Sequence, residues 1–164
     1  MFMGVILYLI IHEGIHFIQA INLGIFEDFR FVGIFGVEIM ITEPLTISGL
    51  TLAMFSGASS LVTIIIGYLL LIFMPKILEL KHKNIKSMLY FITIVFMLID
   101  SLYLSVLSLI FGGDINGISQ GLDVPYFVIR IFYGIVFLVN LIIVIKRVYP
   151  AYVNDFNNHS RQQN

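Results

Sequence analysis

The chain of 164 residues contains no cysteine, and only 12% of its residues are charged. Without cysteine there can be no disulfide framework, no cysteine-ligated metal site and no thiol nucleophile. A soluble domain carries about 25% charged residues, so this composition excludes an ordinary soluble globular domain. It also excludes a disordered chain, which needs high charge and few apolar residues. The formal net charge is −1, so no basic surface suggests nucleic acid as a partner.

Hydrophobic residues make up 59% of the chain, and its mean hydropathy is +1.02. A helix needs about 20 apolar residues to cross a hydrocarbon layer of about 30 Å. Four runs are long enough, and they cover residues 2–23, about 49–73, about 87–111 and about 124–145. The sequence therefore predicts an all-α integral membrane protein with about four transmembrane helices. We expect a single transmembrane domain over residues 1–150, followed by a polar C-terminal tail over 151–164.

The basic residues gather in two segments. One lies between the second and third runs and the other follows the fourth run; together they hold Lys76, Lys81, Lys83, Lys86, Lys146, Arg147 and Arg161. An even number of spans separates the two segments, so both fall on one side of a bilayer. Because Lys and Arg accumulate in cytoplasmic loops, we expect that side to be cytoplasmic, in a multi-pass protein of the cell membrane.

The segment that follows the first run alternates in polarity. One parity carries apolar side chains and the other carries polar ones: Phe29, Phe31, Phe35, Val37, Ile39 and Ile41 against Arg30, Glu38 and Thr42. A period of two with many aromatic and β-branched residues is typical of a strand. Gly33 and Gly36 are candidates for a turn or bulge. The sequence therefore predicts a short β-hairpin-like segment near residues 29–42, with a plain interfacial loop as the alternative.

A short motif within the first run carries chemistry. Residues 12–16 read His-Glu-Gly-Ile-His. Positions i and i+4 lie on one face of a helix, so His12 and His16 can direct both imidazoles at one ion. Zinc suits such ligands together with a carboxylate and a position open to water. The motif predicts His12 and His16 as ligands of Zn²⁺ and Glu13 as the base that takes a proton from water.

The membrane setting strengthens this interpretation. A charged side chain at the centre of a bilayer costs about 3 kcal/mol on insertion scales. A bound metal ion explains why His12, Glu13 and His16 all lie within an apolar helix. The ion neutralises the charge of the carboxylate and binds the lone pairs of the imidazoles. The alternative interpretation is a polar cluster that packs helices together or relays protons.

Two aspartates are candidates for the third ligand. Asp114 follows Gly112 and Gly113 just past the third run, where glycines permit a broken, close-approaching backbone. Asp100 lies in the middle of that run and matches the expected depth of the histidines. The other interpretation of Asp100 is a buried carboxylate paired with Tyr103 or Arg130. We favour Asp114, because a ligand at a helix break can orient freely and stay hydrated.

Taken together, these motifs resemble the site-2 protease group of intramembrane zinc metalloproteases, and also related small membrane zincins with a late Gly-Asp-Ile motif. The resemblance covers roughly residues 8–120. It implies a substrate-binding β-segment near 29–42 and the following site residues: His12, His16 and Asp114 on zinc, and Glu13 as the catalytic base. The chain departs from the family pattern at Ala58, where the family has proline, and at Leu61, where it has asparagine.

We therefore expect a zinc metalloendopeptidase that cuts a membrane protein or peptide within or beside the lipid bilayer. One alternative is a non-enzymatic metal or proton carrier, which needs a continuous path of carboxylates through the membrane. Another is an assembly subunit whose polar cluster only joins helices, and this alternative predicts no bound metal.

Overall fold

Long helices make up most of this chain in the computed structural model, which describes residues 2–32, 36–42 and 46–161. The elements in chain order are α1 Phe2–Leu23, β1 Phe26–Val32, β2 Gly36–Ile41, α2 Gly49–Ile72, α3 Met74–Leu78, α4 Lys83–Leu102, the π-helical turn η1 Tyr103–Leu107, α5 Ser108–Phe111, α6 Asp114–Leu122, α7 Tyr126–Ile143, a second π-helical turn η2 Val144–Val148 and α8 Tyr149–Arg161.

Four of the described helices are long and apolar enough to cross a membrane. They cover Met3–Leu23, Gly49–Ile72, Lys83–Ile110 and Tyr126–Asn157. Each falls on one of the four apolar runs, so the expected number and order of helices are confirmed. The 22 residues of α1 alone extend about 33 Å at 1.5 Å per residue.

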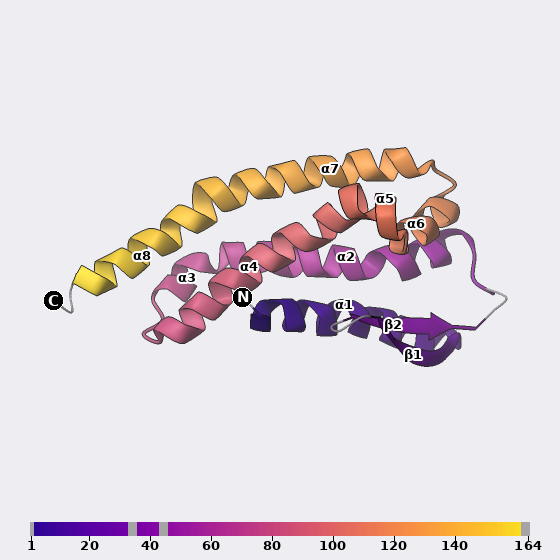
Figure 1. Ribbon diagram of the computed structural model, residues 1–164, viewed down its shortest axis with the longest axis horizontal. Coiled ribbons are helices and arrows are strands. Elements are labelled where there is room, and N and C mark those ends of the chain that lie inside the picture. Colours follow the sequence, from indigo (N-terminus) through magenta and orange to yellow (C-terminus); the bar gives the residue numbers. More distant parts are fainter. Residues whose placement is uncertain (1, 33–35, 43–45, 162–164) are drawn as a thin grey trace.

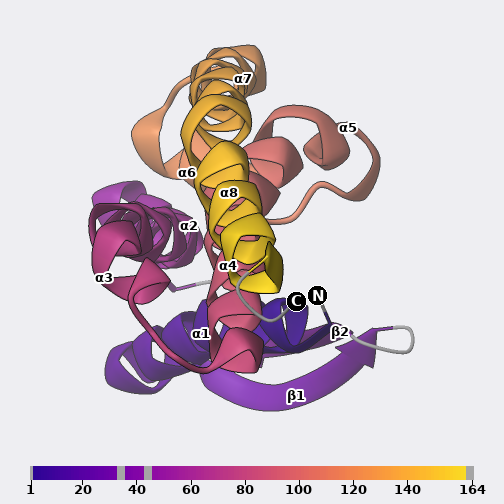
Figure 2. The ribbon, with the colours of Figure 1, turned by 90° about the vertical axis from the view of Figure 1, so that its left-hand side faces the viewer.

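The helices form layers. Helix α1 and the hairpin lie on one side, α7 lies on the opposite side, and α4 lies between them (Figures 1 and 2). The loop that precedes α4 and helix α8 lie at the same end of the molecule, and α6 lies at the other end (Figure 1). The two basic segments therefore share one end, as the sequence predicts; that this end is cytoplasmic stays a prediction.

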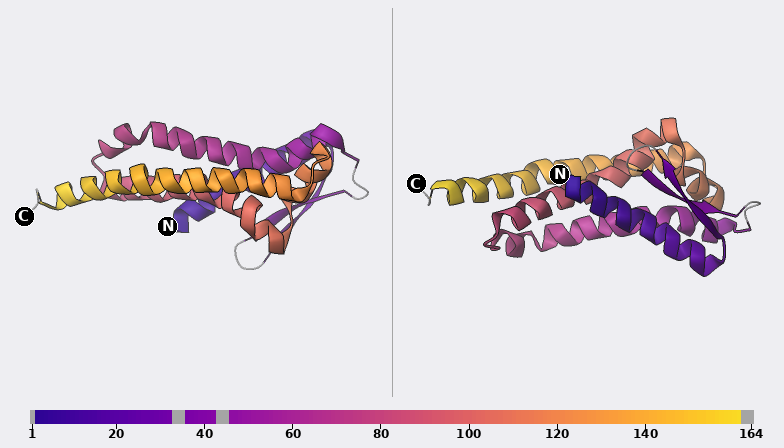
Figure 3. Two further views of the ribbon diagram at one scale, coloured as in Figure 1. Left: turned by 90° about the horizontal axis from the view of Figure 1, so that it is seen from above. Right: turned by 60° about the horizontal axis from the view of Figure 1, so that its bottom comes forward.

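Residues 151–161, within the expected polar tail, are helical. Helix α7 continues through η2 into α8, and Figure 3 shows them as one long rod whose end projects past the other helices. Tyr152 is buried and its ring packs against Tyr90 of α4. Lys86 of α4 donates to Asp155 at 2.6 Å. The apolar and ionic contacts with α4 explain why this helix continues to Arg161.

The two strands confirm the hairpin-like segment. They pair antiparallel, with Phe29 opposite Ile39, and a register shift lies between Phe26 and Asp28. Because this shift changes the alternation, Phe26 joins Phe29 on the apolar face, where both rings pack against Phe17 of α1. Gly33 lies outside the described residues, and Gly36 begins β2 rather than forming a bulge.

Helix α6 packs against α2 at very close range. A Cβ atom at Gly117 would overlap the side chain of Ser56, and one at Gly121 would lie 2.6 Å from the carbonyl oxygen of Gly49. Small residues permit such an approach between helix backbones. On its other side, α6 buries Ile115 in the core between α2, η1 and α7. These contacts fix the position of the first residue of α6, Asp114.

Candidate metal centre

His12 and His16 lie one turn apart on α1, and both side chains are buried. Their rings are 5.1 Å apart between centroids, and both face α2, where Ser59 contacts each of them. The motif spacing predicted this shared face, because i and i+4 residues lie one above the other on a helix.

Asp114 approaches the same two imidazoles from α6. Its Oδ2 lies 3.4 Å from Nε2 of His12, and its Oδ1 lies 3.5 Å from Nε2 of His16. One potential ligand atom from each of the three residues lies within 4.8 Å of the other two. Burial raises the pKa of the Asp114 carboxyl, but its contacts with the imidazoles outweigh burial and lower the pKa to about 2.

The glycine turn before α6 explains how Asp114 reaches the histidines. Gly112 and Gly113 have φ angles of +64° and +80°, which glycine adopts without a steric penalty. The hydroxyl of Tyr103 donates to the Gly112 carbonyl at 3.0 Å, and a Cβ on Gly113 would overlap that hydroxyl. Arg130 of α7 donates to the carbonyl of Ser108, the residue that begins α5. Tyr103 therefore holds the turn directly, and Arg130 contacts the short helix that precedes it.

Asp100 contacts His12 on the other ring nitrogen. Its Oδ1 lies 3.2 Å from Nδ1 of His12, and its side chain is fully buried. Its carboxylate also accepts hydrogen bonds from Tyr8 at 2.8 Å, from Ser60 at 3.0 Å and from Thr63. The alternative interpretation of Asp100 as a buried carboxylate is confirmed, but its partners are not Tyr103 or Arg130. Tyr103 instead donates to the Gly112 carbonyl, and Arg130 donates to Ser108.

Ser59 is a site residue that the sequence analysis did not single out. Its Oγ lies 3.0 Å from Nε2 of His16 and 3.4 Å from Nε2 of His12, and the residue is fully buried. Ser59 lies in the segment Ser56-Gly57-Ala58-Ser59-Ser60, and nothing in that segment distinguishes it from Ser56 or Ser60. Only the tertiary structure places its hydroxyl against both imidazoles.

Glu13 is not among these ligand atoms. Its side chain lines a groove of about 570 Å³ between α1 and the hairpin. The other lining residues are apolar or glycine, with Leu9 and Phe17 from α1 and Phe29 and Ile39 from the strands among them. The groove therefore presents one acidic group next to an otherwise apolar surface.

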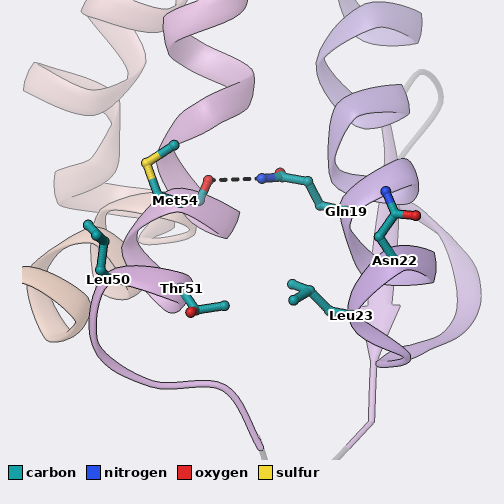
Figure 4. A pocket seen from close by; sticks show the side chains of 6 residues that line it. All are labelled: Gln19, Asn22, Leu23, Leu50, Thr51 and Met54. Atoms are coloured by element: carbon teal, nitrogen blue, oxygen red, sulfur yellow. Dashed lines mark hydrogen bonds between the residues drawn. The ribbon is translucent and has the colours of Figure 1, made fainter.

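A second pocket of about 410 Å³ lies where α1 and α2 diverge (Figure 4). Gln19 reaches across it and donates to the carbonyl oxygen of Met54 at 3.2 Å. This pocket contains no ionisable residue among its lining side chains. Among the described residues, the only group of three potential metal ligands is His12, His16 and Asp114.

The donor set fits zinc. Two imidazole nitrogens and one carboxylate are the protein ligands of a common class of catalytic zinc sites, which leave one position for water. A buried carboxylate on the second nitrogen of a ligating histidine, as Asp100 is on His12, also accompanies such sites.

Comparison with protein-family models, curated proteins and solved structures finds no match to this chain. A functional assignment therefore has to come from the geometry and chemistry of its own residues.

Proposed function

We propose that this protein is a multi-pass membrane protein and a zinc metalloprotease whose active centre lies within the membrane. The proposal is supported most strongly by the meeting of His12, His16 and Asp114 from two helices far apart in sequence. Four helices long and apolar enough to cross a bilayer surround or adjoin this centre. Ionisable side chains inside a bilayer cost free energy. Binding one metal ion is the simplest physical explanation for three of them in one place.

His12, His16 and Asp114 would hold the ion. Zinc, when bound, lowers the pKa of water to about 7 and polarises a carbonyl oxygen. Glu13, one residue along from His12, lines the groove beside this centre. It would be the base that takes a proton from water and returns it to the leaving amine. Asp100 accepts a hydrogen bond from Nδ1 of His12, which leaves Nε2 free to bind the metal.

The groove beside Glu13 supports a peptide as the substrate. Its apolar walls suit side chains from a membrane segment, and the two strands along one wall offer backbone groups to an extended chain. An extended substrate exposes its carbonyls, whereas a helix keeps them in internal hydrogen bonds. The hairpin turns its apolar pairs, such as Phe29 and Ile39, toward α1 and the groove. Its polar pair, Arg30 and Glu38, forms an exposed ion pair at 3.0 Å.

The test compares three purified variants in detergent and in liposomes. Each is assayed for zinc content, for cleavage of labelled casein and for cleavage of a labelled single-span peptide. We expect Glu13→Gln to retain zinc and lose cleavage, and His16→Ala to lose both. Glu79→Gln, an exposed acidic residue at the end of α3, serves as the matched control and keeps both. Cleavage by Glu13→Gln at the wild-type rate, or a wild-type protein without zinc, overturns the proposal.

One observation favours a second candidate, an intramembrane proton or metal carrier. His12 lies between two carboxylates, Asp114 and Asp100, as in a relay. The further partners of Asp100 in the described structure are the neutral hydroxyls of Tyr8, Ser60 and Thr63, so the line of ionisable groups stops there. A carrier would acidify or load liposomes with zinc and would cleave nothing, which a pH-sensitive or zinc-sensitive dye measures directly.

A further inference from the structure

Five of the buried serine and threonine side chains in these helices share one arrangement, whereas Ser60 donates to Asp100 and Ser119 to the carbonyl of Val124. Thr63, Thr93, Ser101, Ser105 and Ser108 each donate to a backbone carbonyl three or four residues earlier in their own helix. This is the usual way to satisfy a hydroxyl inside an apolar helix.

Ser59 departs from that arrangement. In the described structure its hydroxyl has two hydrogen-bond partners, and both are imidazole nitrogens: Nε2 of His16 and Nε2 of His12. These are the same two atoms that Asp114 approaches. The hydroxyl is therefore directed at the centre of the ligand group and not at its own helix.

The distances from the two Nε2 atoms to Asp114 and to Ser59 are close to those between neighbouring ligands of a tetrahedral zinc ion. Bonds to zinc of about 2.0–2.1 Å at tetrahedral angles put neighbouring ligand atoms about 3.3 Å apart. Asp114 oxygens lie 3.4 and 3.5 Å from the two Nε2 atoms. Ser59 Oγ lies 3.4 and 3.0 Å from them. The single Oγ atom of Ser59 thus lies within 3.4 Å of both Nε2 atoms, whereas Asp114 approaches them with one carboxylate oxygen each.

We propose that Ser59 is the fourth side chain of the metal centre, with its hydroxyl at the coordination position that three protein ligands leave over. This inference rests on the proposed metal centre and adds a residue that the His-Glu-Gly-Ile-His motif does not contain. A neutral hydroxyl is a weak ligand, so water or a substrate oxygen displaces it readily, and zinc accepts a fifth ligand in reactive states. Ser59 therefore shields the resting ion without closing the site.

The experiment uses Ser59→Cys in the full-length protein loaded with Co²⁺ in detergent. The wild-type chain has no cysteine, so the new thiol is the only one in the protein. If position 59 contacts the ion, its thiolate becomes a strong ligand and produces a thiolate-to-Co²⁺ charge-transfer absorption in the near ultraviolet. We also expect this variant to lose metal to a chelator more slowly than the wild type.

Ser60→Cys is the matched control. It lies one residue along on α2, and its hydroxyl contacts Asp100 and not the imidazoles. This variant should show the Co²⁺ spectrum of the wild type without the charge-transfer absorption. Absence of that absorption in Ser59→Cys, while the protein still binds Co²⁺, overturns the inference and leaves the proposed function intact. Absence of Co²⁺ binding in the wild type overturns both.

A second variant keeps the inference testable if Ser59→Cys does not fold. Ser59→Ala removes the hydroxyl and opens the fourth position. Azide should then bind the Co²⁺-loaded Ser59→Ala protein more tightly than the wild type, because it no longer competes with the side chain. The visible Co²⁺ spectrum gives the titration curve. Equal azide affinity in the two proteins contradicts a contact between Ser59 and the ion.

Discussion

His12 lies between two carboxylates, with Nδ1 3.2 Å from Asp100 and Nε2 3.4 Å from Asp114. Nε2 of His12 is the nitrogen on the side shared with His16, because Asp114 and Ser59 each contact Nε2 of both imidazoles. Three hydroxyls complete the hydrogen bonding of Asp100. Asp100 therefore contacts the ring nitrogen of His12 that Asp114 does not approach.

The first prediction concerns Asp100→Asn, which keeps the size of the side chain and removes its charge. Loss of a carboxylate behind a ligating histidine typically lowers metal affinity by about 10–100-fold. We expect a loss of that size, measured by competition with a fluorescent zinc chelator. Ser101→Ala is the control, because that hydroxyl bonds only to carbonyls of its own helix. Equal zinc affinity in Asp100→Asn and the wild type would refute the role given to Asp100.

The second prediction concerns the close contact between α6 and α2. Gly117→Ala places a methyl group against Ser56 and pushes α6 away from α2. Overpacking of this kind costs about 1–3 kcal/mol, and the displacement of Asp114 should also weaken zinc binding. Gly134→Ala is the control, since its Cβ would meet only Ser105 at 3.8 Å. Thermal unfolding and chelator competition measure the two effects, and a variant as stable as the control contradicts the packing argument.

The third prediction concerns the turn that carries Asp114. Tyr103→Phe removes the hydrogen bond to the Gly112 carbonyl and leaves the ring in place. A hydrogen bond of this kind contributes about 1 kcal/mol, so we expect zinc affinity to fall several-fold. Tyr68→Phe loses a hydrogen bond to Asn140, away from the centre, and should change stability alone. If the two variants lower zinc affinity equally, Tyr103 has no specific role in positioning Asp114.

The fourth prediction concerns the attachment of α8. Lys86 is 1% exposed and donates to Asp155 at 2.6 Å and to the Leu78 carbonyl at 2.7 Å. Removing one partner of a buried ion pair typically costs about 3–5 kcal/mol. Lys86→Met should therefore expose the C-terminal helix to limited proteolysis, whereas Lys81→Met, at an exposed position, should not. Equal resistance of both variants argues against this attachment.

The sequence alone determined the four apolar helices, the shared face of His12 and His16 and the paired strands. These features depend on local periods, and a period of 3.6 or 2 can be counted along the chain. The same counting missed Phe26, because the register shift near Glu27 changes the alternation there. It also missed the helical continuation of the C-terminal tail, because contacts with Tyr90 and Lys86 stabilise α8.

Only the tertiary structure decided which residues surround the histidines. The sequence left both Asp100 and Asp114 as candidates, because distance along a chain does not give position across a helix bundle. The glycine turn and the close packing of α6 on α2 bring Asp114 to the Nε2 atoms of both histidines. Asp100 contacts the other ring nitrogen of His12, Nδ1. Ser59 joins them for the same reason: a helix face becomes a site only when other helices pack against it.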